Sequence, residues 1–317
     1  MMKLNKLILL LALFSVTISC SPNKDEDTVK LGYLRIGSDL PLFVADSMNL
    51  FEKHGLEVEL VRFGNSNQVI EAFGNGDISV TDIIGSSVVM KYAETKKDFK
   101  IFMISEANSK TNIHQLVVSS GSKVGSVNEL VGKKLAIFPG SQMRVYVKLF
   151  LKKYLDEEEI NQIELVPLSP PQQLEAMRLG QIDAALTLEP TGTSMNQEEI
   201  GTTILNNVLY ESITKPRPFV TALAIMNNNL DERKKQALIS AYSEASYLID
   251  NNPNLARKIM ANWLNLDSSI VQKISLYKYP VGREIDLGNI ELTEQIMYQN
   301  GLLNLDIPFD ELIIGEK

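Results

Sequence analysis

The chain has 317 residues and a formal net charge of −8, with 44 % hydrophobic and 22 % charged residues. This composition is typical of a globular protein, and the length allows two medium-sized domains with separate cores. The acidic balance argues against a nucleic-acid partner, because phosphate backbones are bound by clustered Lys and Arg.

The N-terminus predicts a secretory signal peptide over residues 1–20. Lys3 and Lys6 precede an apolar run from residue 7 to residue 18. A helix of that length spans about 18 Å, which is too short for the ~30 Å hydrocarbon core of a membrane. We therefore expect this run to be the apolar part of an export signal and not a transmembrane helix.

Cys20 is the only cysteine, so the chain cannot form an intramolecular disulfide. The stretch Thr17-Ile18-Ser19-Cys20 resembles a bacterial lipobox, in which the cysteine is lipidated and becomes the mature N-terminus, although Thr17 replaces the usual Leu. We expect Cys20 to carry a lipid anchor and residues 21–28 to form a flexible tether. The alternative is an ordinary signal peptide with an incidental cysteine.

From residue 29 onward, the hydrophobic pattern alternates between strands and helices. The first half predicts strands at residues 29–36, 57–62 and 78–84, and helices at 41–54, 66–74 and 85–94. The second half predicts strands at residues 134–138, 163–167 and 182–188, and helices at 142–154 and 170–179. Such alternation is typical of βαβ units and a mostly parallel sheet.

The two halves also repeat a local motif. Gln68-x-x-Glu71-Ala72 recurs as Gln172-x-x-Glu175-Ala176 at an offset of 104 residues. In both copies a glycine and then an isoleucine follow at the same spacing, on the same expected elements. The repeat predicts two lobes of one topology, although any two βαβ units could share such spacing.

After Pro218 the pattern changes to one strand at 219–226 and a mainly helical block. Helices are expected at 231–249, from 251–253 onward and at 267–274, with a last strand or ordered tail at 309–314. This block has no counterpart in the second half, so it should pack on the first lobe. The chain then crosses between the lobes twice, near 114–118 and 219–223, and the crossings form a two-strand hinge.

These expectations define a domain organisation and a fold class. The first lobe comprises residues 29–114 and 223–317, and the second lobe comprises residues 115–222. Each lobe is Rossmann-like, so the fold class is α/β.

The candidate binding residues lie in the turns after the predicted parallel strands, where open α/β sheets bind ligands. They are Gly37, Ser38, Asp39, Asp82, Ser86, Gly140, Ser141, Gln142 and Glu189. Backbone N–H groups and serine hydroxyls at helix starts suit an anion, whereas the three acids suit an amine or a pyrimidine. Both possibilities stay open, and so does plain turn and cap chemistry. Arg144 and Arg217 are possible cationic contacts or simply surface residues.

Signatures of catalysis are missing from the sequence. His54 and His114 are the only histidines. No nucleotide-binding glycine loop, metal-ligand spacing or nucleophile–base cluster is present, so no cofactor, metal or catalytic residue is expected. His54 stands at the end of a predicted helix, where a structural role fits.

Several segments resemble one family of transport proteins. They are residues 41–60, Asn75-Gly76-Asp77-Ile78, residues 130–136, residues 180–185 and Glu189-Pro190. Together they resemble periplasmic binding proteins for aliphatic sulfonates, nitrate, taurine and thiamine pyrimidine precursors. The resemblance covers about residues 29–265 and implies a type II periplasmic-binding-protein fold and an ABC transporter partner. It also implies ligand contacts at the strand-end turns. The yeast pyrimidine synthases on this fold use a histidine and a cysteine-rich motif, which this chain lacks.

The first functional hypothesis is therefore an exported, lipid-anchored, monomeric solute-binding protein that closes on a small molecule and is recognised by an ABC permease. The second is an enzyme on the same fold, similar to menaquinone-pathway enzymes or pyrimidine synthases. Those menaquinone-pathway enzymes act in the cytoplasm, so the export signal distinguishes the two. A ligand-sensing lipoprotein without a transporter is the third.

Overall fold

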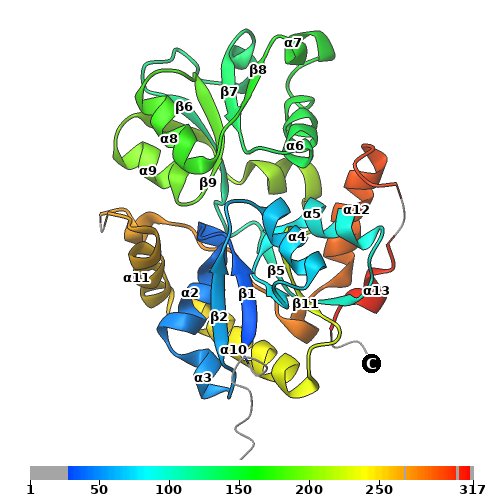
Figure 1. The fold of residues 1–317 in the computed structure, drawn as a ribbon. Helices are drawn as coiled ribbons and strands as arrows, with labels where there is room; N and C mark the ends of the chain where they lie inside the picture. The colour runs from blue at the N-terminus through cyan, green and yellow to red at the C-terminus, as the bar shows by residue number, and fades with distance from the viewer. Residues whose placement is uncertain (1–27, 268, 305–306, 315–317) are drawn as a thin grey trace, which may run out of the picture.

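The computed structural model describes residues 28–267, 269–304 and 307–314. The predicted signal peptide, Cys20 and most of the predicted tether lie outside the described residues. The described chain forms two bodies, one above the other in Figure 1, each built on its own sheet. No helix within these ranges is both long and apolar enough to cross a membrane.

The first lobe is built on a six-stranded sheet in the order β2-β1-β3-β11-β4, with β5 also paired to β11. Its strands are β1 Val29–Tyr33, β2 Val58–Arg62, β3 Val80–Thr81, β4 Ile84–Gly85, β5 Phe99–Ala107 and β11 Phe219–Asn227. The central strand β1 runs parallel to β2 and β3. In contrast, β11 runs antiparallel to β3, β4 and β5.

Helices from both ends of the chain cover this sheet. They are η1 Gly37–Asp39, α2 Leu40–Ser47, α3 Leu50–Lys53, α4 Ser66–Asn75, α5 Ser86–Ala93, α10 Glu232–Asn251, α11 Pro253–Leu264, α12 Leu287–Gln299 and α13 Phe309–Leu312. The longest, α10, buries Leu238, Ala241, Tyr242 and Ala245 on one face, the spacing of an amphipathic helix. The C-terminal helical block therefore packs on the first lobe, as expected.

The second lobe is built on a five-stranded sheet in the order β10-β6-β9-β7-β8. Its strands are β6 His114–Ser119, β7 Lys134–Ile137, β8 Glu164–Pro167, β9 Ala184–Leu188 and β10 Gly201–Leu205. Its helices are η2 Val127–Leu130, α6 Ser141–Leu151, α7 Glu157–Asn161, α8 Pro170–Arg178, α9 Thr191–Gln197 and η3 Tyr210–Thr214. The strand β7 runs parallel to β8 and β9, whereas β6 runs antiparallel to β9 and β10.

The two sheets have matching strand orders, which confirms the topology that the repeat predicts. The order β2-β1-β3-β11 in the first lobe corresponds to β8-β7-β9-β6 in the second. The repeated motif falls on α4 and α8, and a glycine with positive φ follows each helix, Gly76 at 81° and Gly180 at 66°. Glycine suits this position because a left-handed backbone strains residues that carry a Cβ.

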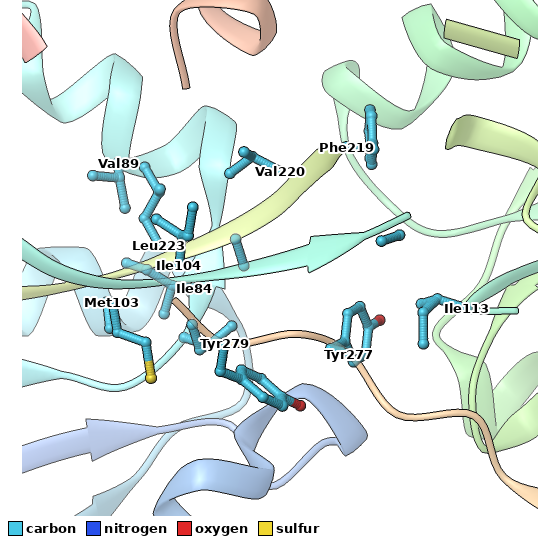
Figure 2. Close-up of a cluster of buried hydrophobic side chains, with 14 of the residues drawn as sticks. Ile84, Val89, Met103, Ile104, Ile113, Phe219, Val220, Leu223, Tyr277 and Tyr279 are labelled. Atoms are coloured by element: carbon cyan, nitrogen blue, oxygen red, sulfur yellow. The ribbon is translucent and has the colours of Figure 1, made fainter. Parts of the chain in front are cut away.

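The chain passes between the lobes at two adjacent places. The first passage joins β5 to β6 through residues 108–113, and the second enters β11 at Phe219. Because Phe219 pairs with Ala107, the two passages lie side by side. Both lie a few residues earlier than the expected 114–118 and 219–223, which belong to the strands themselves. Figure 2 follows the buried core from Leu223 along β11 to Phe219, with Ile113 at the end of the first passage.

Several expected elements differ from the structure. The expected helix 41–54 is divided into α2 and α3 at Asn49, whose φ is 52°. The expected strand 78–84 consists of the short strands β3 and β4, which pair with β11 at separate places. The tail 309–314 forms the helix α13, and only Ile313 makes a β-bridge, with Ile101.

The expected helix 267–274 is reduced to the short turn η4 Val271–Lys273. From Lys273, the last residue of this turn, a segment that we call the strap, residues 273–281, leads to the edge strand β5. The backbone N–H of Glu106 donates to Lys278 O at 2.9 Å, and that of Ile104 donates to Pro280 O at 3.1 Å. These bonds attach the C-terminal part of the strap to the first lobe, while Tyr277 and Tyr279 belong to the buried core (Figure 2).

Candidate functional site

The predicted strand-end turns of the two lobes meet at Gly37. A Cβ atom placed on Gly37 would lie only 2.9 Å from the carbonyl oxygen of Glu189 and 3.1 Å from Cδ of Pro190. Gly37 follows β1 of the first lobe, whereas Glu189 follows β9 of the second. The lobes can approach this closely only because residue 37 has no side chain. Ser38 lies beside it and is only 8 % exposed.

A second contact between the lobes joins α5 to the start of α6. Gln142 Nε2 donates to Ser86 Oγ at 2.9 Å and to the hydroxyl of Tyr146 at 2.9 Å. The backbone N–H of Ser87 donates to Gln142 Oε1 at 3.3 Å. Both Ser86 and Gln142 are binding residues predicted from the sequence, and the structure brings them into direct contact.

Asp39 and Asp82 form a buried pair of carboxyls beneath the turns of the first lobe. The backbone N–H of Ile36 donates to Asp39 Oδ2 at 2.8 Å, and Tyr242 donates to Asp82 Oδ1 at 3.0 Å. Burial raises the pKa of Asp39 well above its ordinary value, and repulsion from Asp82 raises it further. Burial also raises the pKa of Asp82 to about 7, although the hydrogen bond from Tyr242 opposes the rise.

The second oxygen of each carboxyl still needs a hydrogen-bond donor. Asp39 Oδ1 and Asp82 Oδ2 are buried, and the described residues offer neither of them any other donor. A proton shared between the two carboxyls satisfies both oxygens, because a protonated carboxyl donates to its neighbour. Asp39 stands at the N-cap position of α2, but its side chain does not accept from that helix. Its Oδ2 instead accepts from the backbone N–H of Ile36, the N-cap residue of η1.

Glu189 is the centre of a third cluster and is only 6 % exposed. Its Oε1 accepts from Gln115 Nε2 at 2.8 Å, from Thr193 Oγ1 at 2.8 Å and from the backbone N–H of Ser275 at 3.4 Å. Burial raises the pKa of Glu189 to about 7, although these hydrogen bonds favour the charged form. Because Ser275 belongs to the strap, Glu189 links the second lobe to the first.

A cavity of about 280 Å³ lies beside Glu189 and is lined by ten residues. Five are Asn or Gln, three are Thr or Ser, and the other two are Glu189 and Lys273. Eight of the ten come from residues 112–206, whereas Lys273 and Ser275 come from the strap. Every lining side chain therefore carries a polar group, and the cavity spans the junction between the lobes.

The other predicted residues lie apart from these contacts. Gly140 and Ser141 are exposed at the start of α6, and Arg144 is exposed on the same helix. Arg217, in the passage before β11, pairs with Asp286 at 2.9 Å and donates to Asn289 at 3.0 Å, and both partners belong to the first lobe. Neither of the two arginines makes a described contact with Glu189 or the carboxyl pair.

Comparison with known proteins places the chain in a family. The profile of the NMT1-like family matches residues 22–265. The chain belongs to the NMT1-like family. A putative ABC transporter periplasmic binding protein of Brachyspira hyodysenteriae is 22 % identical to it over 285 residues, which cover 84 % of this chain and 79 % of the relative.

Solved structures of low sequence identity share the fold of this NMT1-like chain. The alkanesulfonate-binding protein SsuA of Xanthomonas axonopodis pv. citri, bound to MOPS, superposes with a TM-score of 0.70 at 17 % identity, covering 90 % of this chain and 98 % of that protein. The desulfurization enzyme DSZB superposes with a TM-score of 0.65 at 12 % identity, covering 92 % and 97 %. The fold is thus the type II periplasmic-binding-protein fold, with two Rossmann-like lobes and a two-strand hinge. Fold alone does not separate binding from catalysis, because both kinds of protein use it.

The histidines of this NMT1-like protein have structural surroundings. His54 Nε2 lies 2.9 Å from Glu244 Oε2 at the end of α3. His114 is buried edge-on against Phe219, and burial lowers its pKa to about 3, so it stays neutral. In the part of the chain that the structure describes, no group of three His, Cys, Asp or Glu could hold a metal ion.

Proposed function

We propose that the chain is the exported, lipid-anchored solute-binding component of an ABC importer. It captures a small polar organic or anionic solute in the cleft between its lobes and delivers it, as a monomer, to a membrane permease. The observation that supports this most strongly is the meeting of strand-end turns from the two lobes, Gly37 against Glu189 and Ser86 against Gln142. In open α/β sheets these strand ends are where ligands bind.

The proposed mechanism is closure about the paired passages between the lobes. The moving units are the two lobes, which separate at residues 108–113 and just before Phe219, close to the predicted bounds of 29–114 with 223–317 and 115–222. Two adjacent passages permit rigid-body closure, because only a few backbone dihedrals need to change. The candidate ligand contacts are Gly37, Ser38, Ser86, Gln142 and Glu189, while Gly140 and Ser141 offer backbone and hydroxyl donors at the exposed start of α6.

The main experiment measures compaction in small-angle X-ray scattering with a panel of sulfonates, nitrate, pyrimidines and amines. A solute that binds should reduce the radius of gyration and raise the melting temperature. At 100 times Kd, ligand should add about 2.7 kcal/mol of stability. Tight binding of a solute without compaction would contradict the closure mechanism, and turnover of a bound solute would favour an enzyme.

Gly37→Ala should weaken closure without unfolding either lobe. The added Cβ lies 2.9 Å from the Glu189 carbonyl oxygen, and overpacking of this kind costs about 1–3 kcal/mol. The hinge relieves the clash by opening, so solute affinity should fall about tenfold or more while the melting temperature without solute changes little. Gly125→Ala is the matched control, because its Cβ meets only the flexible end of Glu129, at 3.5 Å. Unchanged affinity and compaction in Gly37→Ala would count against a closed state of this geometry.

Cys20→Ala should release the protein from the membrane, because the lipid is attached to that sulfur in the proposed anchor. Fractionation of expressing cells should find the variant in the soluble extracytoplasmic fraction, and mass spectrometry should find no added acyl mass. Ser19→Ala serves as the control, because a small residue remains before the cysteine. A Cys20→Ala protein that stays in the membrane fraction would refute the lipid anchor.

A further inference from the structure

The cavity beside Glu189 combines one acid and one base supplied by different lobes. Its volume is about 280 Å³, and its other eight lining residues carry only carboxamide or hydroxyl groups. Glu189 extends from the end of β9, whereas Lys273 belongs to the strap. No other charged side chain lines the cavity.

The two charged groups contact the same helix, α9, at positions about one turn apart. Glu189 accepts from Thr193 Oγ1 at 2.8 Å, and Lys273 Nζ donates to Gln197 Oε1. Thr193 and Gln197 are four residues apart on the same helix, a separation of roughly 5–6 Å. Among the ion pairs of the described residues, none joins Glu189 to Lys273. Acid and base therefore face one cavity without neutralising each other directly.

This lining excludes several classes of ligand. A simple anion would face the buried oxygens of Glu189, and a simple cation would face the ammonium of Lys273. An aromatic ring would find no aromatic or aliphatic side chain in the lining to pack against. A molecule with one positive and one negative end matches both charges, and the amides and hydroxyls can hydrogen-bond either end.

We propose that this cavity binds a small zwitterion, with its ammonium group at Glu189 and its acidic group at Lys273. The inference rests on the proposed solute-binding function and names a ligand class for it, at a cavity that shares only Glu189 with the contacts proposed above. Because Glu189 and Lys273 come from opposite lobes, such a ligand bridges them and favours the closed state.

The ligand class is tested by calorimetric titration with molecules that carry both charges and with their single-charge halves. The zwitterions are glycine, β-alanine, γ-aminobutyrate and taurine, and the halves of β-alanine are propionate and ethylamine. The proposal expects at least one zwitterion to bind at least tenfold more tightly than propionate and ethylamine. Equal affinity for a single-charge compound, or no binding of any zwitterion, would overturn it.

Variants locate the site. Lys273→Gln should weaken zwitterion binding at least tenfold while leaving the fold intact, because Lys273 is exposed. Glu189→Gln should weaken zwitterion binding and reduce its preference over propionate. Lys258→Gln, at an exposed position of α11, is the matched control and should bind like the wild type. If Lys273→Gln and Lys258→Gln bind the zwitterion equally well, the assignment of this cavity is wrong.

The outcomes also separate this inference from the proposed function. A sulfonate without an amino group, or a pyrimidine, that binds and compacts the protein while every zwitterion fails would refute the ligand class but keep solute capture. A zwitterion that binds through Lys273 without compaction would keep the site but refute delivery by closure.

Discussion

Replacing Asp82 with Asn should stabilise the protein at pH 8 and flatten the fall of its stability with pH. Asp82 is fully buried, and its pKa rises from 3.8 in the unfolded chain to about 7 in the fold. Between those values the folded state binds more protons than the unfolded state, so stability falls as the pH rises. An amide at residue 82 carries no charge to bury, and it can still accept from Tyr242 and donate to Asp39.

The size of the effect follows from the shift. Each pKa unit corresponds to 1.36 kcal/mol, so the full penalty above pH 7 is of the order of 2–4 kcal/mol for a pair that shares one proton. Urea unfolding at pH 5, 6, 7 and 8 measures it directly. The variant should gain most at pH 8 and little at pH 5. A residual slope should remain, because burial also raises the pKa of Glu189 to about 7.

Two control variants distinguish the effect of removing the buried charge from the effect of disturbing the packing. Asp77→Asn, at an exposed position, should change neither the stability nor its slope with pH. Asp82→Ala should destabilise at every pH, because it leaves the Tyr242 hydroxyl without its acceptor and opens a cavity. If Asp82→Asn keeps the wild-type slope, the carboxyl pair does not share a proton in the fold.

Local signals in the sequence predicted the two α/β lobes, although not the strands β5, β6 and β10. The offset of 104 residues between the two copies of the motif corresponds to α4 and α8, and each glycine lies where the backbone turns left-handed. Gly37 and Glu189 were placed at strand ends because strands that alternate with helices must end at one edge of a parallel sheet. These predictions depend only on periodicity and on turn residues, which act locally.

Contacts that depend on tertiary pairing could not be predicted in the same way. Asp39 meets Asp82 only because β1 lies beside β3, a pairing that no local pattern specifies. The strap is attached to an edge strand by two β-bridges and has no regular hydrophobic periodicity. The sequence therefore gave no indication that Lys273 and Ser275 line a cavity. Gln115 did give one, as a polar residue within the mostly apolar segment that forms β6, but it was not among the predicted binding residues.

The helix α12 shows a related limit. It buries Asn289, Thr293 and Glu294 together with apolar residues, so its buried face lacks the purely apolar stripe on which recognition of a helix depends. Its polar residues serve tertiary contacts, such as the bond from Asn289 Nδ2 to Glu106 Oε1 at 2.7 Å. The polar residues that hydrogen-bond on this buried face are also the reason that the sequence shows no apolar helical stripe there.

Glu189→Ala should destabilise the protein and loosen the strap, whereas Glu189→Gln should retain most of the stability. Alanine removes the acceptor shared by Gln115, Thr193 and Ser275, and buried donors without an acceptor cost about 1–3 kcal/mol each. Water from the adjoining polar cavity offsets part of this loss, so we expect about 2 kcal/mol in total. Glutamine keeps one acceptor oxygen and removes the buried charge, so its stability at pH 8 should lie within about 1 kcal/mol of the wild type.

Hydrogen exchange identifies where the loss occurs. In Glu189→Ala the amide of Ser275 should exchange faster, because its acceptor is gone, while the amide of Lys278, bonded to Glu106 O at 3.1 Å, should keep its protection. That pattern would mean that the strap stays attached to the first lobe and loses only its hold on the second. Equal loss of protection at both amides would show that Glu189 supports the whole strap and not the contact between the lobes.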